Sequence, residues 1–504
     1  MADAPNLLFL VSDNHNRGVT GCYGHPFVHT PVIDAIAARG ARFANSYATS
    51  TLCVPSRAGL ATGRHVHQHG CWDNAIAYDG RIPSWMHRLR DGGSNVTAIG
   101  KLHFRAPEDD NGFTEEILPM HLHEGKGAIK NLMRGFDAEP PCTDGARLRL
   151  YADRSGIGTT HYQDYDRRIT ESTIDWLRAH ARDKGRPWAL YVGYISPHPP
   201  FTVPKRLYDL YPEDRMPLPR RFRRGDRPEH PAMQYMRELD GWGDLTDEQM
   251  LRRVAAGYFG LITHLDEQMG LVMREVEALG LLGNTRIVYT SDHGDLFCWH
   301  GIFGKKNLYE GAVGVPLVMS GPGIPAGRTV QQLASHVDLF PTFVEGAGLA
   351  LDPADKRLPG RSLLPAVGGR EDLDRPVFAE FHAQGSKAGA FMVRHRDMKL
   401  IYHVGMPPQL FDLAADPDEA HDLVEAGTGA GEVARLERIL RSICDPEAED
   451  ARAKADQRRM VAFWGGPEKV LGEDAILFTP PPGVSKADAW RIPPATGQPD
   501  TSIA

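Results

Sequence analysis

Residues 6–12 read NLLFLVS, and the polar pair Asp13 and Asn14 follows at once. A short apolar run bounded by polar residues is typical of a strand that is buried on both faces of a parallel sheet. Three further runs share this character, at residues 96–100 (VTAIG), 188–195 (WALYVGYI) and 286–290 (RIVYT). These runs together predict a parallel sheet as the centre of the fold.

Segments with helical periodicity lie between these strands. A short helix is expected between Thr30 and Gly40, and longer periodic segments cover residues 164–182 and 251–279. Strands that alternate with helices predict an α/β fold, with a large, doubly wound and mostly parallel sheet flanked by helices. Because ligands of such folds bind at the carboxyl ends of the strands, the residues that follow each strand are the candidates for a functional site.

The pattern changes near residue 375. Short strands with turns between them are predicted at residues 377–381, 390–394 and 399–403, and a helix at residues 431–444. This order predicts a smaller C-terminal α+β subdomain of antiparallel strands.

We expect three regions along the chain: a catalytic domain over residues 1–375, the antiparallel subdomain over 376–455, and a Pro-rich tail over 456–504. The tail contains the run PPP at residues 480–482 and is expected to be extended. It is either a solvated segment or an arm that wraps a neighbouring subunit of a homo-oligomer.

Composition limits the classes of function. The chain has 504 residues, a hydrophobic fraction of 41% and a formal net charge of -8 with no basic block, which argues against a nucleic-acid partner. Its six cysteines show no Cys-x-x-Cys spacing and read as reduced thiols, so we expect a cytoplasmic protein. Neither a signal peptide nor an apolar run of about eighteen residues is found, so no membrane partner is expected.

A second informative stretch is CVPSR at residues 53–57, which opens a helix of small residues. Pro55 suits the first helical position, so Cys53 is expected just outside the helix N-terminus, where free N–H groups favour an anion. Arg57, one turn further on, adds a permanent positive charge. A buried structural cysteine is the alternative, but the arrangement favours a nucleophile held against an oxyanion.

Potential metal ligands follow two predicted strands. Asp13 and Asn14 end the first strand, and Asp292 and His293 follow the strand at residues 286–290. Each Asp taken alone could be a helix cap. Two such pairs at two strand ends instead predict one divalent metal; Ca²⁺ is the expected ion, with Mn²⁺ and Mg²⁺ as alternatives because of the His ligand.

Four further segments carry candidate residues. Lys101 and His103 lie two apart after a strand and are expected to point to one side. His198 stands between prolines at another strand end, Asn74 lies in GCWDN, and Lys305 lies in GIFGKKNLYE. A solvated lysine, a structural histidine and a turn-forming asparagine are the alternatives for these positions.

The stretch CVPSR, followed by TGR at residues 62–64, resembles the signature of type I sulfatases, the formylglycine-dependent members of the alkaline phosphatase superfamily. The resemblance runs from about residue 6 to about residue 425. GKLHF at residues 100–104, followed by NGF at 111–113, is most similar to the branch that contains choline sulfatases and phosphonate monoester hydrolases.

The resemblance implies that a maturation enzyme oxidises Cys53 to formylglycine, whose hydrated aldehyde is the nucleophile. It also implies metal ligands at both strand ends, namely Asp13, Asn14, Asp292 and His293. The amide of Asn14 brings no charge, so its role as a ligand is the weakest of the four.

The resemblance assigns the remaining positions to the substrate. Lys101 would bridge the nucleophile and the sulfate, and His103 would assist breakdown of the covalent intermediate. His198 would contact the leaving-group oxygen, and Asn74 would hold a substrate oxygen. Lys305 would contact the sulfate, with Arg57 as a further charge, whereas the adjacent Lys306 would be solvated.

These features predict a sulfuric ester hydrolase that acts on a small-molecule sulfate ester. The alternative is a phosphonate monoester or phosphodiester hydrolase that uses the same site. A non-catalytic binding protein is disfavoured because the reactive positions are intact. The long segments at residues 106–160 and 199–242 are expected to cover the site and to set the substrate.

Overall fold

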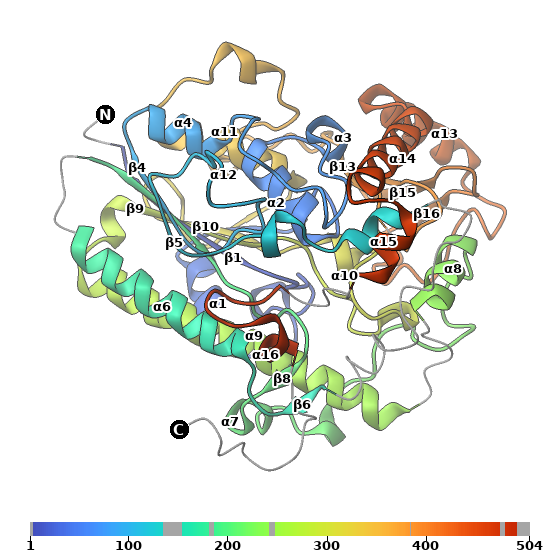
Figure 1. Cartoon of the computed structure of the whole chain (residues 1–504), viewed down its shortest axis with the longest axis horizontal. Coiled ribbons are helices and arrows are strands. Elements are labelled where there is room, and N and C mark those ends of the chain that lie inside the picture. The colour runs from blue at the N-terminus through green and yellow to red at the C-terminus, as the bar shows by residue number, and fades with distance from the viewer. Residues whose placement is uncertain are drawn as a thin grey trace.

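The computed structural model describes residues 4–134, 154–180, 186–240, 247–383, 385–473 and 479–490. Its largest element is a sheet of eight strands (Figure 1). In spatial order the strands are β11 (Arg328–Val330), β2 (Gly40–Phe43), β10 (Leu317–Ser320), β9 (Thr285–Ser291), β1 (Asn6–Ser12), β7 (Trp188–Gly193), β4 (Asn95–Lys101) and β5 (Glu115–Met120).

The centre of this sheet is parallel. Strand β1 lies between β9 and β7, and Ser12 pairs with Ser291 while Val11 pairs with Gly193. Only β10 runs antiparallel to its two neighbours in the sheet. The carboxyl ends of β9, β1, β7 and β4 therefore meet at one edge, and the predicted α/β fold is confirmed.

Helices cover both faces of the sheet (Figure 1). Alternate side chains of β1 serve the two faces: Phe9 and Val11 pack in one core cluster, and Leu8 and Leu10 in the other. Against the first face lie α2 (Cys53–Thr62), α4 (Trp85–Asp91), α11 (Leu339–Gly346) and α12 (Leu364–Val367), and against the second α1 (Pro31–Ala38), α6 (His161–His180) and α9 (Glu248–Ala278).

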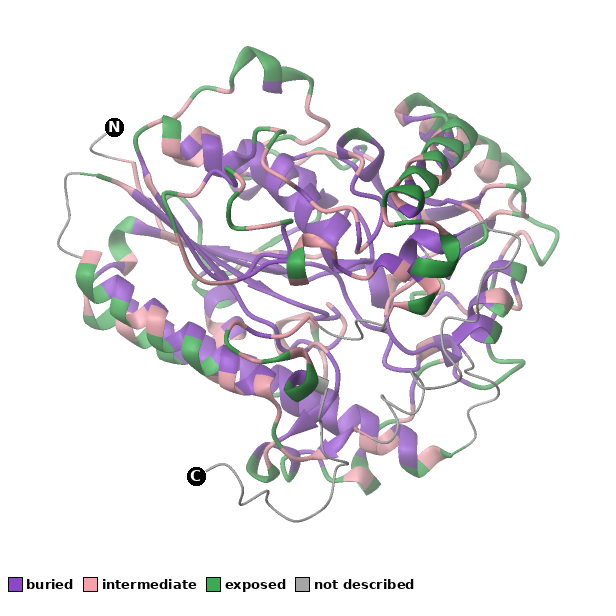
Figure 2. Cartoon of the chain, viewed as in Figure 1, coloured by how far each residue is buried: buried purple, intermediate pink, exposed green. Residues whose placement is uncertain are grey.

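Burial follows this layering (Figure 2). The central strands and the whole of α2 are buried, while the outer faces of α6 and α9 reach solvent. Among the helices in the described ranges, none carries an apolar stretch long enough to cross a bilayer.

The second, smaller sheet has four antiparallel strands: β13 (Val377–Phe381), β14 (Ala390–His395), β15 (Met398–His403) and β16 (Gln409–Asp412). Helix α13 (Ala430–Ile443) packs on one face through Leu436 and Leu440. On the other face Ile401 and Phe411 share a core cluster with Tyr309 of the larger part. The antiparallel subdomain predicted from the sequence is thus present and is joined to the main fold by a common core.

The C-terminal region is less extended than expected. Helix α14 (Pro446–Phe463) runs through residue 456, and α15 (Pro467–Gly472) follows it. Good helix formers fill α14, Pro446 occupies its first turn, and Asp445 caps it by accepting from the N–H of Ala448. Residues 479–485 are non-helical and lead into α16 (Lys486–Trp490), while residues 474–478 and 491–504 lie outside the described part.

The two long segments expected to be loops contain short elements. Within residues 106–160, β5 adds a parallel edge strand beside β4, and residues 135–153 lie outside the described part. Within residues 199–242 lie β8 (Thr202–Val203), α7 (Lys205–Tyr208) and α8 (Pro231–Asp240).

Candidate active site

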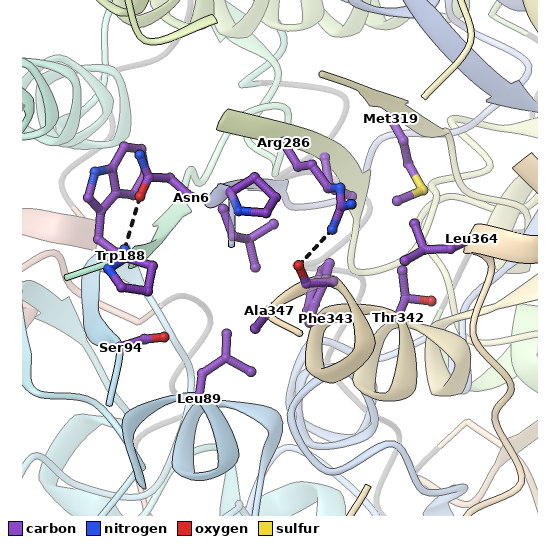
Figure 3. A pocket seen from close by; sticks show the side chains of 15 residues that line it. Asn6, Leu89, Ser94, Trp188, Arg286, Met319, Thr342, Phe343, Ala347 and Leu364 are labelled. Atoms are coloured by element: carbon purple, nitrogen blue, oxygen red, sulfur yellow. Dashed lines mark hydrogen bonds between the residues drawn. The ribbon is translucent and has the colours of Figure 1, made fainter. Parts of the chain in front are cut away.

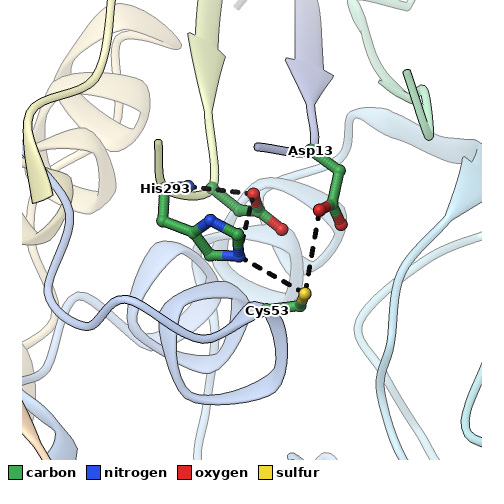
Figure 4. Close-up of side chains that lie close together, drawn as sticks. Asp13, Cys53 and His293 are labelled. Atoms are coloured by element: carbon green, nitrogen blue, oxygen red, sulfur yellow. Dashed lines mark hydrogen bonds and ion pairs between the residues drawn. The ribbon is translucent and has the colours of Figure 1, made fainter. Parts of the chain in front are cut away.

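Four reactive side chains meet at the carboxyl edge of the sheet. Asp13 follows β1, Asp292 and His293 follow β9, and Cys53 begins α2. One donor atom from each lies within 4.8 Å of the others, and all four side chains are buried. Figure 4 shows Asp13, Cys53 and His293 pointing toward one another from these three elements.

Cys53 lies at the centre of this group. Its Sγ is 3.3 Å from Nε2 of His293, 3.2 Å from Nζ of Lys305 and 3.7 Å from Oδ1 of Asp13. Burial and the Asp13 carboxylate raise the pKa of the Cys53 thiol to about 11. The thiol is therefore neutral in this environment.

The start of α2 differs from the prediction. The helix begins at Cys53 itself, so Pro55 is its third residue and not its first. Proline is tolerated there because the first four N–H groups of a helix have no partner within the helix. One of those groups, the N–H of Val54, donates to Oδ1 of Asn74 over 3.2 Å. Asn74 thus lies against the first turn of α2, next to Cys53.

Positive charge surrounds the two carboxylates. Nε of Arg57 donates to Asp292 over 2.8 Å, and its Nη2 lies 3.4 Å from Oδ2 of Asp13. Nζ of Lys101 forms an ion pair with Asp13, and Nζ of Lys305 lies 3.7 Å from it. Burial opposes ionisation of Asp13, but Lys101 and Lys305 outweigh it and hold the pKa of Asp13 well below its usual value. Three cations against two carboxylates leave the centre suited to an anionic ligand.

Asn14, the fourth predicted ligand, lies beside this cluster, where its N–H donates to Oδ1 of Asp292 over 3.2 Å. Its Oδ1 accepts from Nζ of Lys305 over 2.6 Å, and its Nδ2 donates to Asp295 over 2.6 Å. Asp295 also accepts the N–H groups of Phe297 and Gly304, so it fixes the loop that leads to Lys305. The sequence reasoning missed Asp295, although its place two residues after His293 is a signal that could have found it.

Two of the predicted histidines lie beside the cluster. Burial and Lys305 hold the pKa of His198 well below its usual value, and burial and Lys101 do the same for His103. Both imidazoles are therefore neutral near pH 7. Lys101 ends β4, but His103 has a left-handed backbone with φ 54°, so the extended geometry predicted for this pair does not reach His103.

The loop of His198 is held from α6. Asp166 accepts the N–H groups of Ile195 and Ser196 over 2.8 and 3.1 Å. Nδ1 of His198 donates to the carbonyl of Pro199 over 2.7 Å, because a carbonyl can only accept. When the imidazole is neutral, its lone pair is therefore on Nε2.

The two adjacent lysines differ from each other, but Lys306 is not solvated as predicted. Its Nζ binds Asp240 over 2.8 and 3.0 Å; the Asp240 side chain is buried, and that of Lys306 is 11% exposed. Lys305 instead reaches Cys53 and Asn14. The register predicted for these lysines places Lys305 at the cluster, and the structure agrees with that placement.

Helix α14 supports Asn74 from a distant part of the chain. Nε2 of Gln457 donates to Asp73 over 2.8 Å and to the carbonyl of His382 over 2.9 Å. Asp73 also accepts the N–H of Ala75, which closes the turn around Asn74. No local pattern in the sequence links Gln457 to this turn, because 384 positions separate it from Asp73.

A pocket at the opposite edge of the sheet has a different character (Figure 3). It is lined by apolar side chains such as Leu89, Trp188 and Phe343, with Arg286 donating to the carbonyl of Gly346 over 2.7 Å. Its cavity volume of about 20 Å³ is on the scale of one water molecule. The cluster around Cys53 is therefore the stronger candidate for chemistry.

Comparisons with known proteins agree with this geometry. A family model described as Sulfatase matches residues 5–349, and one described as N-sulphoglucosamine sulphohydrolase, C-terminal, matches residues 298–444. A choline-sulfatase of Rhizobium meliloti is 31% identical over 482 residues, 91% of each chain. Arylsulfatase K of Danio rerio is 28% identical over 88% of this chain and 84% of its own. The solved phosphonate monoester hydrolase of Agrobacterium radiobacter has a TM-score of 0.70 at 25% identity, covering 87% of this chain and 95% of that one.

Proposed function

The chain belongs to the Sulfatase family and is a sulfuric ester hydrolase, and we propose that it cleaves small-molecule sulfate esters at the cluster around Cys53. One observation carries this proposal. The side chain of Cys53 is buried. On one side it contacts His293 and Asp13, whose side chains are of the kinds that bind metals, and on the other it contacts the ammonium of Lys305. A nucleophile there would face an ester whose sulfate oxygens meet positive charge.

The family generally uses formylglycine, and the surroundings of Cys53 fit that group. A maturation enzyme would oxidise the thiol to an aldehyde, and the hydrated aldehyde would supply an oxygen nucleophile. Position 53 is buried at the first residue of α2, with Lys305 and His293 within 3.3 Å of its side chain. The ammonium of Lys305 would stabilise negative charge on an oxygen at this position. Nδ1 of His293 donates to the carbonyl of Gly294 over 2.9 Å, so its Nε2 would orient that oxygen as an acceptor or bind a metal.

The donor set also fits a divalent metal. Asp13, Asp292 and His293 would hold the ion together with the group at position 53. Two carboxylates and one imidazole suit Ca²⁺, Mn²⁺ or Mg²⁺, and we propose Ca²⁺ first. A bound cation would add to the positive potential at the sulfate oxygens. The amide oxygen of Asn14, which accepts from Lys305 over 2.6 Å, would be the fourth protein ligand and the only uncharged oxygen among them.

The remaining side chains would bind and orient the ester. Lys101, Lys305 and Arg57 would neutralise the sulfate oxygens, and Asn74 would hold one of them beside the first turn of α2. His198 would contact the leaving oxygen through Nε2. Because neutral His198 carries its lone pair on that atom, it can protonate the leaving alcohol only after the bound anionic ester raises its pKa.

A phosphonate monoester hydrolase is the second candidate. The solved enzyme of that name aligns with this chain over 95% of the enzyme's length, at 25% sequence identity. Sulfate and phosphonate esters are similar in shape and both are anionic. Steady-state kinetics on a sulfate ester and a phosphonate monoester with the same leaving alcohol separate the two. A higher kcat/KM on the phosphonate would overturn the preference for sulfate.

A substrate screen with the mature enzyme tests the proposed function. Choline sulfate and a set of aryl sulfates are suitable probes, because relatives named for those esters match most of the chain. The Cys53→Ala variant is the control for contaminating activity. Hydrolysis of at least one sulfate ester by the parent enzyme and by none of the Cys53→Ala samples is expected. Equal hydrolysis by both proteins would contradict the proposal.

A further inference from the structure

We infer that the C-terminal segment, residues 479–490, completes the active site of its own chain, and that Thr479 positions His103. This inference rests on the proposed function, because it assigns a partner to a histidine of that site. In Figure 1 the segment runs in dark red beside α6 and α9 and ends in α16. Its first residue, Thr479, lies 376 positions away from His103 in sequence.

The contact with His103 is direct. Nε2 of His103 lies 3.0 Å from the hydroxyl of Thr479, and the imidazole is buried. This is the only side-chain hydrogen bond of His103 within the described part of the chain, where its buried Nδ1 has no partner. The hydroxyl of Thr479 therefore occupies one ring nitrogen and leaves the other for the reaction.

This arrangement fixes the orientation of the imidazole. A threonine hydroxyl can donate to Nε2 or accept from Nε2–H, so it pairs with either tautomer of the neutral ring while it holds the ring plane. The backbone at His103 adds a further constraint, since its left-handed φ of 54° is rare outside glycine. A hydrogen bond to a second group is how proteins commonly orient a reactive histidine.

Thr479 is also linked to His198, through Tyr162. The hydroxyl of Tyr162 donates to the carbonyl of Thr479 over 3.0 Å. The ring of Tyr162 packs edge-on against the imidazole of His198, with centroids 5.8 Å apart. Thr479 thus connects, through its side chain and its backbone, to both histidines proposed to act on the ester.

The rest of the segment is anchored away from the cluster. Arg168 of α6 donates to the carbonyl of Pro482 over 3.0 Å. Ser485 precedes α16, and its hydroxyl accepts the N–H of Asp488 over 3.1 Å. This bond is local to the start of α16 and touches neither Thr479 nor His103, so variants at Ser485 are matched controls for the loss of a hydroxyl in this segment.

Kinetics of three single variants test the inference. Thr479→Val keeps the shape of the side chain and removes the hydroxyl, and it should lower kcat by roughly 5- to 10-fold, the effect of one lost neutral hydrogen bond. Thr479→Ser should restore most of kcat, and Ser485→Ala should leave it unchanged. The pH dependence of kcat should shift in Thr479→Val, because the ring loses its partner, and should stay as in the parent enzyme in Ser485→Ala.

A spectroscopic arm separates this inference from the proposed function. In the Cys53→Ala background, imidazole ¹⁵N signals of His103 are assigned by their loss in His103→Gln. Adding Thr479→Val should move them, and adding Ser485→Ala should not. This readout needs no turnover, so it stands even if the substrate class is wrong. Unmoved His103 signals and an unchanged kcat in Thr479→Val would overturn the role of Thr479.

A truncated chain tests the segment as a whole. Protein that ends at Phe478 should lose more kcat/KM than Thr479→Val, because Tyr162 loses its acceptor as well. A rise in kcat/KM would show that the segment blocks the site and would overturn the inference. Mixing the truncated chain with Cys53→Ala should restore no activity, since the segment acts on its own chain. Recovered activity in the mixture would show that the segment is exchanged between subunits.

Discussion

Replacing the adjacent lysines by methionine, one at a time, should change two different properties. Lys305→Met should lower the rate of hydrolysis, and Lys306→Met should lower the stability of the fold. Methionine preserves most of the apolar length of the side chain and removes the charge. Nζ of Lys305 lies 3.2 Å from the Sγ of Cys53, whereas Nζ of Lys306 binds Asp240 over 2.8 Å. The first substitution removes charge from the proposed sulfate pocket, and the second removes the partner of a buried carboxylate.

The magnitudes follow from these surroundings. A single lost contact to a developing oxyanion costs roughly 10²- to 10³-fold in rate, so Lys305→Met should lower kcat/KM by that factor. Lys306→Met leaves Asp240, whose side chain is 3% exposed, with one ionic partner fewer. Breaking a buried ion pair costs about 3–5 kcal/mol of unfolding free energy, so this variant should melt earlier. Its kcat/KM should stay within about 2-fold of the parent enzyme, the size expected for a charge outside the pocket.

The assay is steady-state kinetics on one sulfate ester, together with thermal unfolding of both variants. Kinetics are measured well below the lower melting temperature, so that both proteins are folded. Substitution of Asp240 by asparagine is the control, because it should reproduce the stability loss of Lys306→Met and leave the rate intact. A larger loss of kcat/KM in Lys306→Met than in Lys305→Met would refute the assignment of the sulfate contact.

Three further outcomes are expected. Asp292→Ala should lose its divalent metal by elemental analysis, whereas Asn14→Ala, which removes an uncharged ligand, should lose less of it; equal metal content in the two would contradict the ligand set. Asn74→Ala, which frees the N–H of Val54, should lower kcat/KM by roughly 10-fold, and unchanged kinetics would remove Asn74 from the site. Burial raises the pKa of Asp266 to about 7 in the folded protein, whereas an unfolded Asp titrates at about pH 4. The unfolded chain therefore loses this proton first, and the free energy of unfolding should fall by about 4 kcal/mol as the pH rises from about 4 to about 7. Asp266→Asn should therefore flatten the fall in melting temperature over this range, and the same fall as in the parent protein would contradict the buried titration.

The strands of the sheet centre could be predicted because burial on both faces leaves a continuous apolar signal, as in β1 and β7. Strand β5 could not, since it lies at the sheet edge and its sequence EEILPM is mostly half-exposed. The tail prediction extended the conformation expected of the prolines at residues 480–482 back to residue 456, where the helix formers of α14 instead specify a helix. The two parts of this region differ in composition, so one conformation could not be predicted for both.

The same distinction holds within the site. Cys53, Asp13 and Asp292 could be predicted because each stands at the end or start of an element that its own neighbours specify. Gln457 and Thr479 could not, because their contacts join positions more than 370 residues apart and depend on how α14 and the C-terminal segment pack. The ion pair of Lys306 was missed for a similar reason, since its partner Asp240 lies in α8, 66 positions away in sequence.

The state of residue 53 is the most direct test of the proposed mechanism. Peptide mapping by mass spectrometry, on active enzyme from a host that contains a maturation enzyme, should find the aldehyde in the peptide that carries position 53. Specific activity should rise in proportion to the fraction converted, from preparation to preparation. Full activity in protein whose Cys53 peptide is entirely in the thiol form would contradict the proposed nucleophile.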